Sequence, residues 1–191
     1  MKKALALVLT VFLSGCVSFT SNNVGNTPKN EIVGTNRPDV LLTVQVFTTY
    51  EGVADMQKNA ELKRAFEREI TGSFYDAGTF GEVSHNVYAP KYKVDVVVRG
   101  TYTECKWCNY ATYGTLFIVP SWTNDRYQYD VRITDLRTKR TYSHQYYETS
   151  VEVKELLLAL GMPFTYDNVR DMHKRVFDRI VTQVVQLNFG I

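Results

Sequence analysis

The stretch RYQYDVRITDL, residues 126–136, decides the fold class of this chain. Apolar and polar side chains alternate along it, as they do in a strand that buries one face and leaves the other in water. After the short polar link 137–140, residues 141–153 predict a second strand. We expect the two strands to form an antiparallel hairpin. The chain is therefore organised around a β-sheet.

Further strands and two long helices are expected on either side of this hairpin. Apolar residues recur at helical spacing in residues 56–77 and 168–187, which predicts two amphipathic helices. Shorter runs with the composition of strands lie at 40–47, 80–87, 94–102 and 115–119. Helices that are separated by consecutive strands indicate an α+β fold. We expect a mixed sheet of about five strands, with the two long helices packed on one face.

The start of the chain has the pattern of a secretory signal. Met1, Lys2 and Lys3 precede an apolar run, residues 4–13, that only Thr10 interrupts. A run of this length, at about 1.5 Å per residue, is too short to cross a hydrocarbon core of about 30 Å. The run therefore predicts a signal peptide and not a permanent membrane span.

Residues 13–16, Leu-Ser-Gly-Cys, resemble the lipobox of bacterial lipoproteins. The resemblance implies that residues 1–15 are removed and that Cys16 becomes the lipidated first residue, with palmitate among its acyl chains. More than one acyl chain makes a stable membrane anchor. Val17 implies the outer membrane, on its periplasmic face, because Asp at this position favours the inner membrane in enterobacterial lipoproteins. The alternative is an ordinary secretory signal with a chance cysteine.

The remainder of the chain is expected to be a tether followed by one domain. Turn-forming residues dominate residues 16–39, which predicts a flexible tether, and residues 40–191 are expected to form a single periplasmic domain. Lys and Arg number 22 against 20 Asp and Glu, and removal of Lys2 and Lys3 leaves 20 against 20. A neutral mature chain without a basic patch speaks against nucleic acid as a partner.

Short motifs connect the chain to known lipoproteins. Residues 94–100, VDVVVRG, are similar to a strand motif written Ala-Asp-Tyr-Val-Val-x-Gly, and residues 135–140, DLRTKR, are similar to the turn Asp-x-x-Thr-Gly-Lys without its glycine. These motifs resemble the domain of the curli-secretion lipoprotein, the penicillin-binding-protein activator and the N-terminal domain of the Tol propeller protein. Residues 117–122, FIVPSW, and 162–164, MPF, resemble uncharacterised proteobacterial outer-membrane lipoproteins. The resemblance implies an α+β domain and no catalytic residues.

The pair Cys105 and Cys108 is the strongest candidate for chemistry. A Cys-x-x-Cys pair forms a structural disulfide, a pair of free thiols, a redox motif or half of a metal site. The segment that follows, residues 109–114, has no helical pattern, and the three histidines of the chain are single and widely spaced. An oxidising periplasm favours the structural disulfide. We expect no metal site and no cofactor.

Two apolar segments, 116–120 and 156–164, have two interpretations. Either they are buried, as a strand and a short helix, or they form an exposed contact surface. The residues of this predicted contact surface are Leu116, Phe117, Ile118, Trp122, Leu157, Leu158, Met162 and Phe164. The charged side chains His144, Glu148, Glu152 and Glu155 are expected to lie on the solvated surface of the fold.

The sequence thus predicts a non-enzymatic lipoprotein that acts as a binding or assembly component of the cell envelope. Its expected partners are the membrane, through the lipid, and an envelope protein or further copies of the chain. The alternative is a periplasmic thiol–disulfide protein or another envelope enzyme.

Overall fold

A computed structural model describes residues 15–26, 37–115, 119–155 and 168–189. The two long helices and the hairpin are present as predicted, and the chain also forms β1 and a third helix that were not predicted. The elements are β1 (Gly15–Thr20), β2 (Val40–Tyr50), β3 (Val53–Ala54), α2 (Met56–Asp76), β4 (Val83–Ser84), β5 (Tyr92–Glu104), α3 (Lys106–Gly114), β6 (Ser121–Asp135), β7 (Thr141–Glu155) and α4 (Asn168–Phe189).

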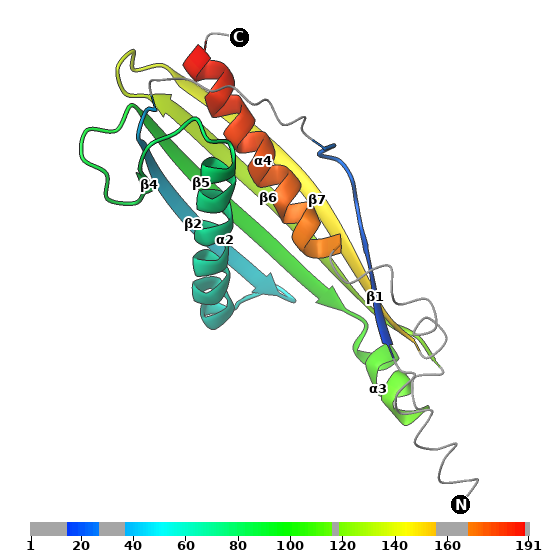
Figure 1. Cartoon of the computed structure of the whole chain (residues 1–191). Helices are drawn as coiled ribbons and strands as arrows, with labels where there is room; N and C mark the ends of the chain where they lie inside the picture. The colour runs from blue at the N-terminus through cyan, green and yellow to red at the C-terminus, as the bar shows by residue number, and fades with distance from the viewer. Residues whose placement is uncertain (1–14, 27–36, 116–118, 156–167, 190–191) are drawn as a thin grey trace, which may run out of the picture.

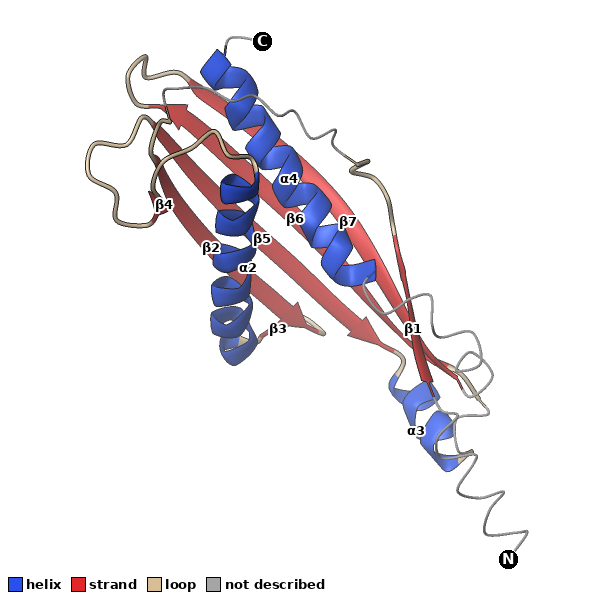
Figure 2. Ribbon diagram, viewed as in Figure 1, coloured by secondary structure: helices blue, strands red, loops and turns tan. Residues whose placement is uncertain are grey.

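The strands form one mixed sheet of seven strands in the order β1-β7-β6-β5-β2-β3, with β4 paired to β2 (Figures 1 and 2). β2 and β5 are parallel, and α2 connects them. β5, β6, β7 and β1 are antiparallel to their neighbours along this side of the sheet. The predicted hairpin is confirmed, because β6 and β7 pair from Ser121 with Lys154 to Thr134 with Thr141.

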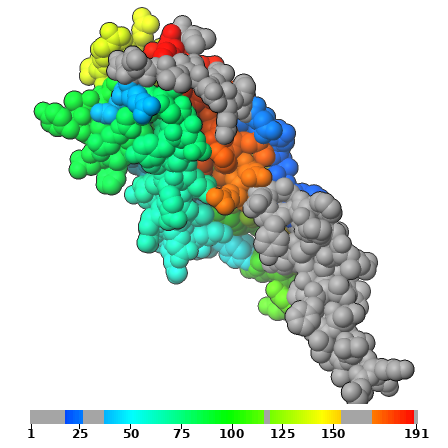
Figure 3. Space-filling model, viewed as in Figure 1, coloured from blue at the N-terminus to red at the C-terminus, as the bar shows by residue number. Residues whose placement is uncertain are grey.

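The two long helices cover one face of the sheet, as Figures 2 and 3 show. Asp55 caps α2, accepting a hydrogen bond from the amide of Lys58 at 2.9 Å, and Gly78 with φ +67° follows its last turn. The apolar stripe of each helix packs on the inward side chains of the strands. This core includes Val44, Val96, Val131 and Ile133 of the sheet, Phe66, Ile70 and Phe74 of α2, and Met172, Phe177 and Ile180 of α4.

The α+β class is confirmed, and the sheet is larger than expected. β3 and β4 have two residues each, which is too short for an alternating pattern to show in the sequence. Of the predicted strand 80–87, only Val83–Ser84 is a strand, β4. Of the predicted strand 115–119, Thr115 is the C-cap residue of α3, and residues 116–118 lie outside the described residues.

The predicted tether is wrong at its N-terminal part. β1, which begins at Gly15, pairs with β7 in an antiparallel ladder from Gly15 opposite Glu155 to Thr20 opposite Ser150. The sequence of β1, GCVSFT, has no clear strand pattern, and its ladder forms because the hydrogen bonds come from the backbone. Residues 37–39 also belong to the fold, since the Asp39 carboxylate accepts a hydrogen bond from the Glu82 amide at 2.7 Å. Residues 27–36 lie outside the described part of the chain.

Candidate functional site

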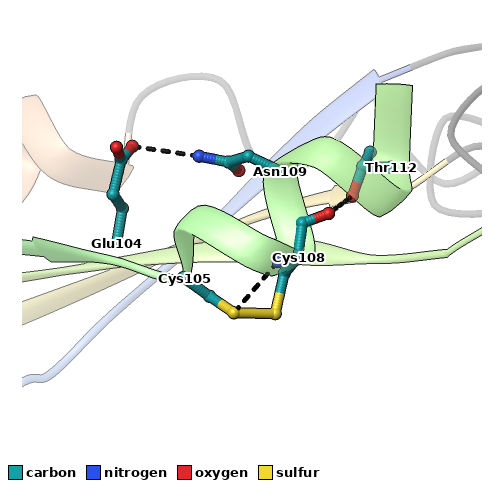
Figure 4. Close-up of a disulfide and its surroundings, with 5 residues drawn as sticks. All are labelled: Glu104, Cys105, Cys108, Asn109 and Thr112. Carbon is teal, nitrogen blue, oxygen red and sulfur yellow. Dashed lines mark hydrogen bonds between the residues drawn. A yellow bond between two sulfur atoms is a disulfide. The ribbon is translucent and has the colours of Figure 1, made fainter. Parts of the chain in front are cut away.

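A short helix, α3, follows β5 at one end of the sheet. The sequence predicts no helix at residues 109–114, and this prediction is wrong. The Cys105 sulfur accepts a hydrogen bond from the amide of Cys108 at 3.2 Å, and Cys105 therefore caps the helix N-terminus. The Asn109 side chain donates to Glu104 at 3.0 Å (Figure 4). The usual sequence signal of a helix N-terminus is Ser, Thr, Asp or Asn at the N-cap position. α3 has a cysteine there, so its start was not recognised in the sequence.

Cys105 and Cys108 form a disulfide, with their Cα atoms 5.1 Å apart (Figure 4). The bridge closes the first turn of α3, and the Thr112 hydroxyl donates to the Cys108 carbonyl at 2.7 Å in the next turn. Thr112 is buried, and the Cys105 amide donates to the Trp122 carbonyl of β6 at 3.3 Å. The disulfide and these contacts fix α3 on the end of the sheet. No cluster of three or more metal-ligating side chains occurs among the residues that the structure describes.

The outward side of α3 is aromatic. Trp107 is 84% exposed and Tyr110 is 73% exposed, and their ring centroids lie 6.2 Å apart. Tyr113 continues the row at a spacing of three residues and is also exposed. Large aromatic side chains are usually at least half-buried in a folded domain. This row, Trp107, Tyr110 and Tyr113, is called the aromatic face of α3 below.

The backbone of Cys16 lies at the same end of the sheet as α3. Cys16 is opposite Lys154 of β7, and Lys154 is opposite Ser121 of β6. The residue after Ser121, Trp122, holds the first residue of the Cys-x-x-Cys pair through the backbone hydrogen bond given above. We call this part of the molecule the α3 end: α3, Gly15–Val17, and the strand ends at Ser121–Trp122 and Val153–Glu155. Figure 1 shows it opposite the C-terminus of α4.

A buried carboxylate holds the chain that follows β1. Glu148 of β7 is only 1% exposed and accepts hydrogen bonds from the Ser21 hydroxyl at 2.5 Å and from the Val24 amide at 2.7 Å. Arg175 of α4 donates to the Ser21 carbonyl at 3.1 Å. Glu148 is thus not on the solvated surface, as the sequence analysis expected. The expectation is wrong because the partners of Glu148 are more than a hundred residues away in the sequence.

Most of the predicted contact surface lies outside the described residues, namely Leu116, Phe117, Ile118, Leu157, Leu158, Met162 and Phe164. Trp122 is described and is 47% exposed. It lies on β6 opposite Val153, at the α3 end. Trp122 thus lies at the same end of the sheet as α3. Trp107 and Tyr110 were not among the predicted contact residues, because their segment has no helical pattern in the sequence.

Two ionisable groups under the helices have displaced pKa values. Burial raises the pKa of Asp125 on β6 to about 6, against the opposing effect of Lys58. The Lys58 ammonium lies 3.3 Å from the ring centroid of Tyr102, beside this group. Burial lowers the pKa of His173 on α4 to about 4, and its Nδ1 atom is 2.5 Å from the Tyr129 hydroxyl. These side chains belong to the packing between helices and sheet.

The sheet face opposite the helices is polar. It carries a shallow groove of about 440 Å³ lined by residues that include Asp95, Arg99, Asp130 and Arg132. Asp130 pairs with Arg99 and accepts hydrogen bonds from Gln128 at 2.9 Å and Gln145 at 2.8 Å. The acidic and basic groups of this groove balance one another, so the groove has no strong preference for a charged ligand.

Comparison with known proteins does not place the chain in a family. No family model matches it, and no curated protein matches it. A dodecameric PelC variant from Paraburkholderia phytofirmans is 5% identical over 87% of this chain and 95% of that chain, with a TM-score of 0.37. A putative neuraminyllactose-binding hemagglutinin homolog from Helicobacter pylori is 10% identical over 84% of each chain, with a TM-score of 0.42. These low TM-scores carry no argument about function.

Proposed function

We propose that this protein is a lipid-anchored lipoprotein of the outer membrane that acts as a non-enzymatic binding or assembly component of the cell envelope. The observation that carries the proposal is the sequence of its first residues: a positive start, a short apolar run, and Leu-Ser-Gly immediately before Cys16. Acylation of Cys16 would hold the domain on the periplasmic face of the membrane.

Exposed aromatic side chains support a contact role. The α3 end gathers exposed aromatic side chains, with Trp107 and Tyr110 on α3 and Trp122 on β6. Aromatic side chains are enriched at contact surfaces because they bury a large area at a small cost in conformational entropy. We propose that the partner of this lipoprotein is an envelope protein or a second copy of the chain.

Mass spectrometry of the N-terminal peptide tests the anchor directly. The full chain is produced in a Gram-negative host with isotope-labelled palmitate, and membranes are separated on a density gradient. We expect the label on a mature chain that begins at Cys16 and sediments with the outer membrane. Cys16→Ser should abolish labelling, and the matched control Cys105→Ser with Cys108→Ser should retain it. An unlabelled wild-type chain would contradict the proposal.

Crosslinking in the periplasm tests the binding role. We expect the intact chain to be recovered with a defined envelope partner or as a defined oligomer. Recovery of the wild-type chain alone would contradict the binding role while leaving the anchor untouched.

A thiol–disulfide protein is the second candidate, and one observation favours it. Cys105 occupies the N-cap position of α3, where the helix dipole and free amides stabilise a thiolate. In that reaction a substrate dithiol attacks the Cys105–Cys108 disulfide through a mixed disulfide. The substrate loses two electrons and becomes a disulfide, and Cys105 and Cys108 become thiols.

Equilibration of the chain with glutathione buffers of known ratio separates the two candidates. A structural disulfide stays oxidised in buffers that reduce catalytic disulfides, whereas a redox-active pair is reduced at a potential near that of its compartment. We expect the structural behaviour. Ready reduction, together with an acidic thiol in alkylation experiments, would establish the second candidate.

A further inference from the structure

We propose that the aromatic face of α3 docks on the phospholipid headgroup surface next to the acylated Cys16, so that the protein has a second, non-covalent contact with its membrane. The inference rests on the lipid anchor of the proposed function and adds the surface that faces the bilayer. Trp107 and Tyr110 are the residues that carry it.

The chemistry of these side chains fits a lipid interface. Tryptophan and tyrosine combine an apolar ring with one polar N–H or O–H group, and they are enriched where membrane and water meet. Trp107 and Tyr110 project from one side of α3, with their ring centroids 6.2 Å apart. Both are among the most exposed large side chains of the described residues. Both side chains lie on the surface rather than in the core, where they are accessible to the headgroup layer of a membrane.

The position of the helix fits the same interface. Neighbouring strands lie about 4.8 Å apart, so the two steps from Cys16 through Lys154 to Ser121 span about 10 Å. Trp122 follows Ser121 on β6, and its carbonyl accepts a hydrogen bond from the Cys105 amide at the start of α3. Because β1 is paired from Gly15 onward, little free chain separates an acyl group on Cys16 from the sheet. An acyl group on Cys16 is therefore attached at the same end of the sheet as α3.

The charge and the rigidity of α3 agree with this orientation. The helix, KWCNYATYG, contains no acidic residue, and its one lysine, Lys106, pairs with Glu51. The nearest further carboxylate, Glu104, accepts a hydrogen bond from the Asn109 side chain at 3.0 Å. The Cys105–Cys108 disulfide and the buried Thr112 hold the opposite side of the helix. A fixed helix presents its aromatic side chains at little cost in entropy.

Quenching of tryptophan fluorescence by brominated lipids measures the proposed contact. The full chain is produced with its signal in a Gram-negative host and reconstituted into phosphatidylethanolamine–phosphatidylglycerol vesicles. Trp122→Phe leaves Trp107 as the single tryptophan. The matched control carries Trp107→Phe, Trp122→Phe and Tyr88→Trp, which places the tryptophan in the fully exposed loop before β5, at the other end of the sheet. Flotation and mass spectrometry of Cys16 are run on the same samples.

We expect bromines placed near the headgroups to reduce Trp107 fluorescence by about two-fold, because an interfacial tryptophan lies at that depth, and to leave the control unchanged. Two outcomes in a chain that floats and carries lipid would overturn the inference and leave the anchor unaffected. One is equal quenching at the two positions, and the other is no quenching at Trp107. Absence of lipid on Cys16 overturns the proposed function and, with it, the inference that rests on the anchor. A chain that neither floats nor is quenched contradicts both.

Discussion

Single residues under the helices determine how the chain responds to pH and how its N-terminal segment is held. Glu148, His173 and Asp125 are polar groups in or beside the core, and none of them has a signature in the sequence. Their neighbours come from elements that are distant along the chain. Burial gives each of them an energetic role that their residue type alone does not indicate.

Substitution of Glu148 should release the segment that follows β1. Glu148→Ala removes the acceptor of two hydrogen bonds, from Ser21 and from the Val24 amide. Hydrogen bonds to a charged group contribute about 2 kcal/mol, which corresponds to about thirty-fold in a local opening equilibrium. We expect the Val24 amide to exchange with solvent faster by this factor. The control Glu61→Ala, on the exposed side of α2, should leave the rate unchanged, and an unchanged rate in Glu148→Ala would show that Glu148 does not hold the segment.

His173 should make the fold less stable in acid. Its pKa falls from 6.5 to about 4 on folding, so the unfolded chain binds the proton more tightly. This contribution to stability is complete above pH 6.5 and is lost as the pH falls toward 4, by about 3 kcal/mol in total. We expect the free energy of unfolding of His173→Phe, measured in urea, to lack this loss. His144→Phe is the control, and an identical pH dependence in His173→Phe would contradict the assignment.

Asp125 should have the opposite effect in the same pH window. Its pKa rises from 3.8 to about 6 on folding, so the folded chain keeps the proton longer and stability decreases as the pH rises from about 4 to 6. The group is partly exposed, and solvent screening reduces the effect to about 1 kcal/mol. Asp125→Asn should therefore gain stability relative to wild type as the pH rises from 4 to 7. A constant difference between the two chains over this range would show that Asp125 titrates normally.

At the scale of elements, the disulfide and the cap make α3 a stable unit despite its length. In the chain-entropy model, a bridge across four residues contributes about 2 kcal/mol. A serine at position 105 would keep a capping oxygen, whereas an alanine would not. The contributions of bridge and cap are therefore separable by the choice of substitution.

Cleavage by trypsin after Lys106 measures the opening of α3. With Cys105→Ser and Cys108→Ser, we expect cleavage about thirty-fold faster than in the wild type, because cleavage follows the population of the open form. With Cys105→Ala and Cys108→Ala the rate should rise about five-fold further, since the cap is lost as well. Cleavage after Lys58 in α2 serves as the internal control. Equal rates in the wild type and in both variants would mean that other contacts hold α3.

The elements that could be predicted from the sequence are those with a long, regular pattern. The expected helix 56–77 and the hairpin strands 126–136 and 141–153 match α2, β6 and β7 to within a few residues. β1 and α3 escaped prediction for physical reasons. β1 pairs with β7 through backbone hydrogen bonds, which leave no side-chain pattern in the sequence, and α3 carries a disulfide and a sulfur cap in its first turn. The parts of the candidate site that the sequence predicted are Cys16, Cys105, Cys108 and Trp122, because the others depend on these two elements.

At the scale of the whole molecule, the sheet is long and the α3 end is one of its tips (Figure 1). β6 has fifteen residues, and at about 3.3 Å per residue it is about 50 Å long. If the α3 end faces the bilayer, the C-terminal end of α4 and the loop before β5 point away from it. No helix among the described residues is long and apolar enough to cross a membrane.

Neutron reflectometry on a supported bilayer tests this orientation. With the acylated chain bound, we expect a protein layer about 50 Å thick, as set by the length of the strands. A chain that lies on its helices or on its open sheet face would give a layer of about 25 Å, the depth of one sheet with one layer of helices. The thinner layer would contradict the upright orientation.

The pairing of β1 from Gly15 onward also bears on the order of events during biogenesis. In the full-length chain, the bond between Gly15 and Cys16 lies inside the ladder between β1 and β7, whereas a signal peptidase needs its substrate bond extended and free. Under the proposed processing, cleavage must therefore precede the docking of β1, and until β1 docks, β7 presents an unpaired strand edge to other chains. An uncleaved chain in which β1 has already docked hides the bond from the peptidase.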